Sequence, residues 1–182
     1  MTTSEESSKY ILKEVEKILS VNNKESVNDV IECIMKAEKI FVYGVGRSGL
    51  VAKGFAIRLV QLGLQVYFIG DIATPIVDDK SLVLVVSATG ETMSAVQTAN
   101  ICRRVGADVV VITSSPHSKL AHAGNVVFTL KTEATDESNR LAPLGTLFED
   151  ASTILLDGII AELMARMGQD HRSMRSRHSI WV

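Results

Sequence analysis

The stretch Ser81-Leu-Val-Leu-Val-Val86, followed by Ser87-Ala-Thr-Gly-Glu-Thr92, decides the fold class of this chain. The first six residues are a nearly continuous apolar run, which is typical of a strand buried on both faces of a parallel sheet. The next six residues are mostly small or hydroxyl-bearing, and a helical pattern follows them. We therefore predict a buried strand whose carboxyl end turns directly into a helix.

A second junction of the same kind lies nearer the N-terminus. Lys39-Ile-Phe-Val-Tyr43 leads into Gly44-Val-Gly46-Arg47-Ser48-Gly49, and a helical run begins at Leu50. At both junctions the free N–H groups and the positive end of a helix dipole meet small residues, which suits a bound phosphate. Two such turns in one small domain predict a substrate with a phosphate at one end and a reacting group at the other.

Strand and helix patterns alternate along most of the chain. Strands are expected at 40–43, 65–69, 82–86, 109–112 and 126–130, and helices at about 48–62, 92–105, 118–123 and 146–167. We predict one domain over 1–182, an α/β three-layer α-β-α sandwich with a five-stranded, parallel, flavodoxin-like sheet. The first and third strands are then neighbours, so both junctions face one crevice.

We also predict the structure of the segments that flank this core. Two amphipathic helices within 1–38 are expected to pack on the sheet or on a partner subunit. The polar stretch 131–143 is expected to be a loop, and the basic tail 168–182 is expected to contribute to the site.

Composition excludes several classes of protein. The chain has 182 residues, 46% of them hydrophobic, and a net charge of −2, which allows a buried core and argues against nucleic acid as a partner. No apolar run approaches the ~20 residues that span a bilayer, and the acidic N-terminus is unlike a secretory signal. Cys33 and Cys102 have no partner at motif spacing, and neither do the histidines, so no metal site is expected. We expect a cytoplasmic protein without a membrane partner.

The junction motifs have alternative interpretations. Gly44-x-Gly46-x-x-Gly49 matches the dinucleotide fingerprint, and Asp71 follows at about the 20-residue spacing of a ribose-binding acid. A dinucleotide-binding protein leaves the second junction unexplained, and the chain has no second domain for hydride transfer. The hydroxyls of Ser48 and of 87–92 also suit helix N-caps, although one hydroxyl is enough for a cap.

Three segments together resemble the sugar isomerase (SIS) domain: Gly46-Arg47-Ser48-Gly49, Ser87-Ala-Thr-Gly-Glu-Thr92 and Pro143-Leu-Gly-Thr-Leu-Phe-Glu149. With the closing Arg177-His178, the chain is similar to the 6-phospho-3-hexuloisomerases over nearly its whole length. The resemblance implies interconversion of D-arabino-hex-3-ulose 6-phosphate and D-fructose 6-phosphate, without a metal or cofactor. In the ribulose monophosphate pathway this step serves formaldehyde fixation or pentose phosphate synthesis.

The same resemblance implies how the chain assembles. It implies a homotetramer whose active sites are built between subunits, with 3-hexulose-6-phosphate synthase as a functional partner. The ending Ser179-Ile-Trp-Val182 departs from the Ala-Asn-Leu-Glu type of ending of the family, and Trp181 is a residue that we expect another subunit to bury.

Carried over to this sequence, the resemblance assigns a role to each site residue. The sugar phosphate would be bound by Gly46, Arg47, Ser48, Ser87, Ala88, Thr89, Gly90, Glu91 and Thr92. Glu149 would be the base that moves a proton between adjacent sugar carbons, and His178 would assist ring opening or proton transfer.

Two alternatives stay open. From the pattern alone, Thr146-Leu-Phe-Glu149 is a capping box in which Glu149 only bonds back to the Thr146 N–H. The chain as a whole also fits a non-catalytic phosphosugar-binding module. Such regulators normally carry a helix-turn-helix domain, and the segment 1–38 is too short and not basic enough for one.

Overall fold

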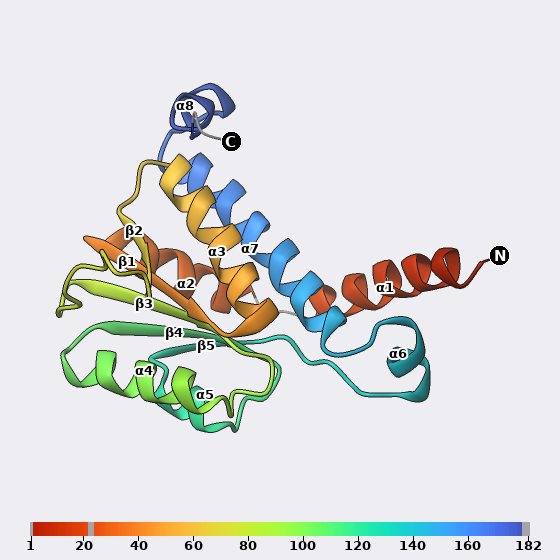
Figure 1. Ribbon diagram of the computed structural model, residues 1–182. Coiled ribbons are helices and arrows are strands. Elements are labelled where there is room, and N and C mark those ends of the chain that lie inside the picture. The colour runs from red at the N-terminus through yellow and green to blue at the C-terminus, as the bar shows by residue number, and fades with distance from the viewer. Residues whose placement is uncertain (1, 22–23, 180–182) are drawn as a thin grey trace.

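The computed structural model describes residues 2–21 and 24–179, and a parallel five-stranded sheet lies at its centre (Figure 1). The strands are β1 (Lys39–Gly44), β2 (Val66–Phe68), β3 (Ser81–Val86), β4 (Asp108–Thr113) and β5 (Val126–Thr129). Their order in the sheet is β2-β1-β3-β4-β5. The predicted flavodoxin-like order is therefore confirmed, with β1 and β3 as neighbours.

Helices cover both faces of the sheet, as Figure 1 shows. The helices are α1 (Thr3–Ser20), α2 (Lys24–Lys36), α3 (Gly46–Gln61), α4 (Met93–Arg104), α5 (Lys119–Ala123), α6 (Asp136–Leu141), α7 (Thr146–Arg166) and α8 (His171–Ser176). α4 and α5 pack on one face, and α2, α3 and α7 cover the other. Each residue of β3 is buried, which explains why that strand reads as an apolar run rather than as an alternating pattern.

The two N-terminal helices pack differently from each other. α2 contacts β4 and β5 on the sheet, whereas α1 lies along α7 and α6 and projects beyond the sheet (Figure 1). Ser7 Oγ donates to the Leu141 carbonyl at 2.6 Å, and the Arg140 guanidinium pairs with the Glu6 carboxylate. Thus α2 packs on the sheet, while the apolar stripe of α1 packs against another helix.

The prediction of a loop over 131–143 is wrong in part, because α6 lies within it. Thr135 and Ser138 form a capping box in which the Thr135 Oγ1 accepts from the Ser138 N–H at 3.0 Å, and the Ser138 Oγ accepts from the Thr135 N–H at 2.8 Å. These hydrogen bonds stabilise the start of α6, although the polar composition of the segment had favoured a loop.

The tail 168–182 also contains a helix, because α8 occupies part of it and Asp170 caps it. Trp181 lies outside the described residues.

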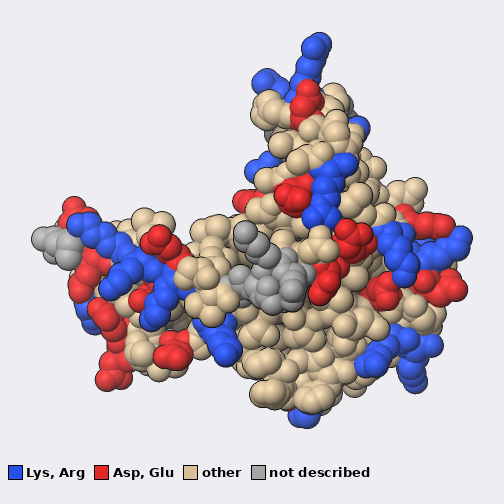
Figure 2. Space-filling model, turned by 180° about the vertical axis from the view of Figure 1, so that it is seen from behind, with Lys and Arg blue, Asp and Glu red and all other residues tan. Residues whose placement is uncertain are grey.

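No helix in the described parts of the chain combines the length and the apolar character that crossing a bilayer requires. On the face shown in Figure 2, acidic and basic side chains are mixed along α1 and around the body. That face therefore carries no broad patch of a single sign, in keeping with the small net charge.

Candidate active site

The two junctions meet at the carboxyl edge of the sheet. Gly44 at the end of β1 pairs with Val86 at the end of β3. Because paired strands lie roughly 4.8 Å apart, the segments 45–48 and 87–92 begin side by side. The structure thus brings the two predicted anion-binding turns to one place.

Close backbone contact shapes the first junction. A Cβ on Gly49 would lie 2.6 Å from the Gly44 carbonyl oxygen, so the helix can approach the strand only because this position is a glycine. Gly46 has a φ of +59°, and Val45 occupies the N-cap position of α3 without a capping side-chain bond to any described residue. The interpretation of Ser48 as a helix cap is therefore wrong, and its half-buried hydroxyl lies in the first turn of α3.

Side chains at the end of β4 and just after it hold the second junction in place. The Ala88 carbonyl accepts hydrogen bonds from the Ser114 N–H at 3.0 Å, the Ser114 Oγ at 2.6 Å and the Thr113 Oγ1 at 3.1 Å. Gly90 has a φ of +64° and lies directly against Ser118, which leaves no room for a Cβ. Thr92 is the N-cap of α4, but its side chain makes no capping bond within the described structure. The capping alternative is therefore wrong for Thr92 as well.

Glu91 is held by Lys119 and braces the second junction. The Lys119 N–H donates to the Glu91 carboxylate at 3.1 Å, and the Lys119 ammonium lies 2.9 Å from it. Lys119 accordingly lowers the pKa of Glu91. The neighbouring Thr89 Oγ1 accepts from the Glu91 N–H at 3.3 Å, and the contacts between Glu91 and Lys119 tie this turn to the start of α5.

Glu149 lies in the first turn of α7 and is only 8% exposed. The helix begins after Gly145, whose φ is +86°, and the preceding Leu144 also adopts a left-handed conformation with φ +56°. Thr146 Oγ1 donates to the Pro143 carbonyl at 2.7 Å, and no capping box forms between Thr146 and Glu149. The capping interpretation of this glutamate is therefore wrong.

Instead, the Glu149 carboxylate reaches across to α3. Its Oε2 lies 2.5 Å from the Arg47 Nε, although no well-aligned hydrogen bond to Oε2 forms among the described residues. Burial raises the pKa of Glu149, the Arg47 guanidinium opposes that rise, and the adjacent Asp150 adds to it, with a net rise. A carboxylate with a raised pKa is a stronger base when it is ionised, which suits proton abstraction.

An open groove with a volume of about 430 Å³ runs from this ion pair between α3 and α7. At its far end Arg58 Nε lies 3.9 Å from Asp157 Oδ1. The groove is lined by Arg47, Leu50, Val51, Gly54, Phe55, Arg58, Glu149, Asp150, Thr153, Leu156 and Asp157. Leu50 is 69% exposed there and gives the groove an apolar wall.

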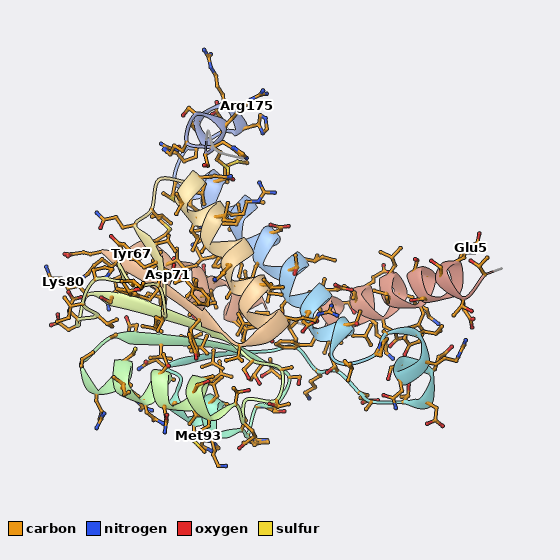
Figure 3. All side chains as sticks on the ribbon, viewed as in Figure 1. Glu5, Tyr67, Asp71, Lys80, Met93 and Arg175 are labelled. Carbon is orange, nitrogen blue, oxygen red and sulfur yellow. The ribbon has the colours of Figure 1, made fainter. Side chains whose placement is uncertain are left out.

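His178 is far from Glu149 within one chain. Arg177 Nη1 donates to the Gln61 carbonyl at the C-terminal end of α3, whereas Arg47 and Ser48 are at its N-terminal end. α3 has 16 residues and is therefore ~24 Å long. In the view of Figure 3, Arg175 on α8 and Met93, just after the second junction, lie at opposite ends of the molecule.

Sequence reasoning missed the residues that support the second junction. Thr113 ends β4, and Ser114 and Ser118 follow it at the same sheet edge, in the hydroxyl-rich run Thr113-Ser-Ser-Pro-His-Ser118. The rule that located the two junctions, polar residues directly after a buried strand, also applies to this run. In the described parts of the chain no group of three His, Cys, Asp or Glu side chains is placed to hold a metal ion.

With this geometry established, comparison with known proteins defines the family. Residues 33–147 match the family model of the SIS domain, and the chain belongs to that family. The 3-hexulose-6-phosphate isomerase of Methanocaldococcus jannaschii is 34% identical over 159 residues, 85% of this chain and 83% of that protein. The protein of the same name from Bacillus subtilis is 31% identical over 173 residues, 93% of this chain and 94% of that one.

A solved structure agrees with these relatives. It is a Methanococcus jannaschii protein for which the function of 3-hexulose-6-phosphate isomerase was inferred. It superposes with a TM-score of 0.84 at 30% identity, covering 97% of each chain. The similarity to 6-phospho-3-hexuloisomerases, another name for the same activity, is thus confirmed, and the chain is related to sugar-phosphate isomerases.

Proposed function

We propose that this protein is a ketose isomerase that interconverts D-arabino-hex-3-ulose 6-phosphate and D-fructose 6-phosphate. The observation that carries the proposal is the buried Glu149 carboxylate, which lies beside the first junction and is ion-paired with Arg47. Relatives of similar length that carry this activity in their names support the choice of substrate.

The two junctions bind the phosphate in this proposal. The free N–H groups at the start of α3 and the hydroxyls of Ser48, Ser87, Thr89 and Thr92 offer donors at one edge of the sheet. Gly46, Ala88 and Gly90 contribute backbone there, and Glu91 keeps the second turn in place through Lys119. Binding the remote phosphate fixes the reacting carbons and contributes binding energy to the chemical step.

Proton transfer then needs one base. Glu149 removes the proton from C2 of the 3-ketose, and the electron pair moves toward the C3 carbonyl to give a 2,3-enediolate. The same carboxyl returns the proton to C3, while O2 releases its proton and O3 takes one up. The carbonyl therefore forms at C2 and a hydroxyl at C3, which yields fructose 6-phosphate. General acid–base catalysis of this kind accelerates a reaction by about 10²–10⁴-fold.

His178 enters this mechanism from a neighbouring subunit. Within one chain the length of α3 separates it from Glu149, so a site that uses both residues needs two chains. A homotetramer would satisfy this requirement. We place the enzyme in the cytoplasm and in the ribulose monophosphate pathway, with 3-hexulose-6-phosphate synthase as the enzyme that supplies or consumes the 3-ketose.

Glu149→Gln tests the base. We expect turnover of fructose 6-phosphate to fall by about 10²-fold or more, because the amide cannot accept the proton. The variant should still be stabilised by fructose 6-phosphate in a thermal-shift titration. Glu162→Gln, a matched change on the exposed face of α7, should leave turnover unchanged. Near-normal isomerisation by Glu149→Gln would refute the assignment, and binding without turnover in the wild type would indicate a phosphosugar-sensing module.

Mixing two inactive variants tests the shared site. In a hybrid of Glu149→Gln and His178→Ala subunits, one site combines an intact glutamate with an intact histidine from the other chain. Unfolding and refolding the two variants together should therefore restore part of the activity that each lacks alone. If no activity returns although mixed oligomers form, His178 does not act across subunits.

A further inference from the structure

The environment of Glu149 poses a physical problem for a base. Glu149 is only 8% exposed, and burial favours the neutral form of a carboxyl group. A protonated carboxyl cannot accept a proton from a sugar carbon. A cation beside Glu149 would counter this effect of burial and keep a larger share of the carboxyl ionised at a given pH.

The charged groups around α7 point to one residue for that task. On α7 itself, Asp150 carries the same charge as Glu149, and Asp157 lies near Arg58 of α3 at the other end of the groove. Three carboxylates on the other helices that pack on α7 are ion-paired elsewhere. These pairs are Glu6–Arg140 and Glu14–Lys17 from α1, and Glu32–Arg166 from α2.

Among the described residues, Arg47 is the cation that contacts the Glu149 carboxylate. Its Nε lies 2.5 Å from Glu149 Oε2, which is close enough for a strong charge–charge attraction in a partly buried setting. The two residues come from the first turns of two different helices, α3 and α7. The side chain of Arg47 is 58% exposed and lines the groove at the end where Glu149 lies.

We propose that Arg47 is a positioning residue, whose guanidinium holds Glu149 ionised and turned toward the groove. This role differs from that of a phosphate ligand, the role that the resemblance implies for Arg47, and it rests on the proposed function of Glu149. A ligand for the phosphate would change the affinity for the sugar at every pH. A group that keeps the base ionised changes the pH at which the enzyme becomes active.

The direction of the effect follows from the two opposing influences. Burial raises the pKa of Glu149, and the Arg47 guanidinium lowers it. Removing the guanidinium therefore leaves the rise unopposed, and a larger share of the carboxyl is protonated at a given pH. Activity should be lost on the acidic side and should return as the pH rises.

Arg47→Met tests this with a pH profile of the isomerisation. We expect kcat at about pH 6 to fall about tenfold relative to the wild type and to recover toward about pH 9, with KM nearly unchanged. Arg47→Lys should shift the acidic limb by less, because the ammonium keeps the charge but not the planar geometry. Lys53→Met removes a cation from the same helix that lies over the Phe68 ring, and its profile should match the wild type.

A different kinetic outcome would overturn the proposal. If Arg47→Met raises KM by the same factor at every pH and leaves the acidic limb in place, Arg47 only binds the substrate. A second readout does not depend on activity. Side-chain ¹³C NMR, assigned with Glu149→Gln, follows the titration of the Glu149 carboxyl in the wild type, Arg47→Met and Lys53→Met. We expect its midpoint to move upward in Arg47→Met alone.

The two readouts separate the two hypotheses. An unchanged NMR midpoint in Arg47→Met refutes the role of Arg47, whatever the protein catalyses. A shifted midpoint in a protein that shows no isomerase activity instead refutes the proposed function and leaves the ion pair established.

Discussion

The two strand-to-helix junctions have similar sequences, yet different forces hold them. After β1, backbone meets backbone: Gly44 and Gly49 touch, and the side chain of Arg47 is free to reach α7. After β3, side chains from the neighbouring β4 edge hold the turn, with hydrogen bonds to Ala88 and an ion pair at Glu91. The first turn therefore depends on glycines, which have no side chain, and the second depends on hydrogen bonds and an ion pair made by side chains. Different substitutions should disrupt the two turns.

Gly49→Ala should have the largest effect on stability. Its Cβ would lie 2.6 Å from the Gly44 carbonyl oxygen, so β1 and α3 would have to separate. We expect a loss of about 2–3 kcal/mol in the free energy of unfolding, measured by urea denaturation. Gly54→Ala on the same helix is the control, because a Cβ there meets nothing within 4 Å.

Helix propensity alone predicts that Gly54→Ala gains up to about 1 kcal/mol. Equal losses for the two alanine variants would show that the first junction is not held by close backbone contact.

Ser114→Ala should have an intermediate effect and should act on the second junction alone. It removes the 2.6 Å hydrogen bond to the Ala88 carbonyl, while the Ser114 N–H and the Thr113 hydroxyl remain bonded there. We expect a loss of about 1 kcal/mol and a weaker affinity for the sugar phosphate, seen in thermal unfolding with and without fructose 6-phosphate. Ser94→Ala, an exposed serine in α4, should change neither value.

Glu91→Gln should have the smallest effect, visible as a pH dependence. Lys119 lowers the pKa of Glu91 in the folded protein. Its contribution is therefore present above the ordinary pKa of 4.5 and is lost as the pH falls through the lowered value. Between about pH 6 and about pH 3.5 the melting temperature should fall slightly less in Glu91→Gln than in the wild type. Parallel curves for the two proteins would show that this ion pair does not stabilise the turn.

Local pattern was enough to predict most of the fold. The apolar run of β3, the glycines after β1 and the helical periods indicated a parallel sheet between helices, because strand burial and helix amphipathicity are local signals. The helix α6 was missed because polar composition was given more weight than the Thr135–Ser138 capping box. The hydroxyls of Thr113 and Ser114 were also within reach of the same reasoning.

Contacts between distant segments were not predictable in this way. Glu149 looked like one half of a capping box, because Thr146 stands three residues before it in the sequence. Its actual partner, Arg47, belongs to another helix, and only the packing of α3 against α7 brings the two together. The distance of His178 from Glu149 likewise depends on where α8 docks.

The sequence by itself determined the α/β architecture and the two anion-type turns, because both arise from residues that are adjacent in the chain. The tertiary structure decided that Glu149 is buried against Arg47 and that His178 lies at the other end of α3. These features depend on how helices pack across the sheet. A side chain's pKa and its partners follow from that packing, and no local pattern records them.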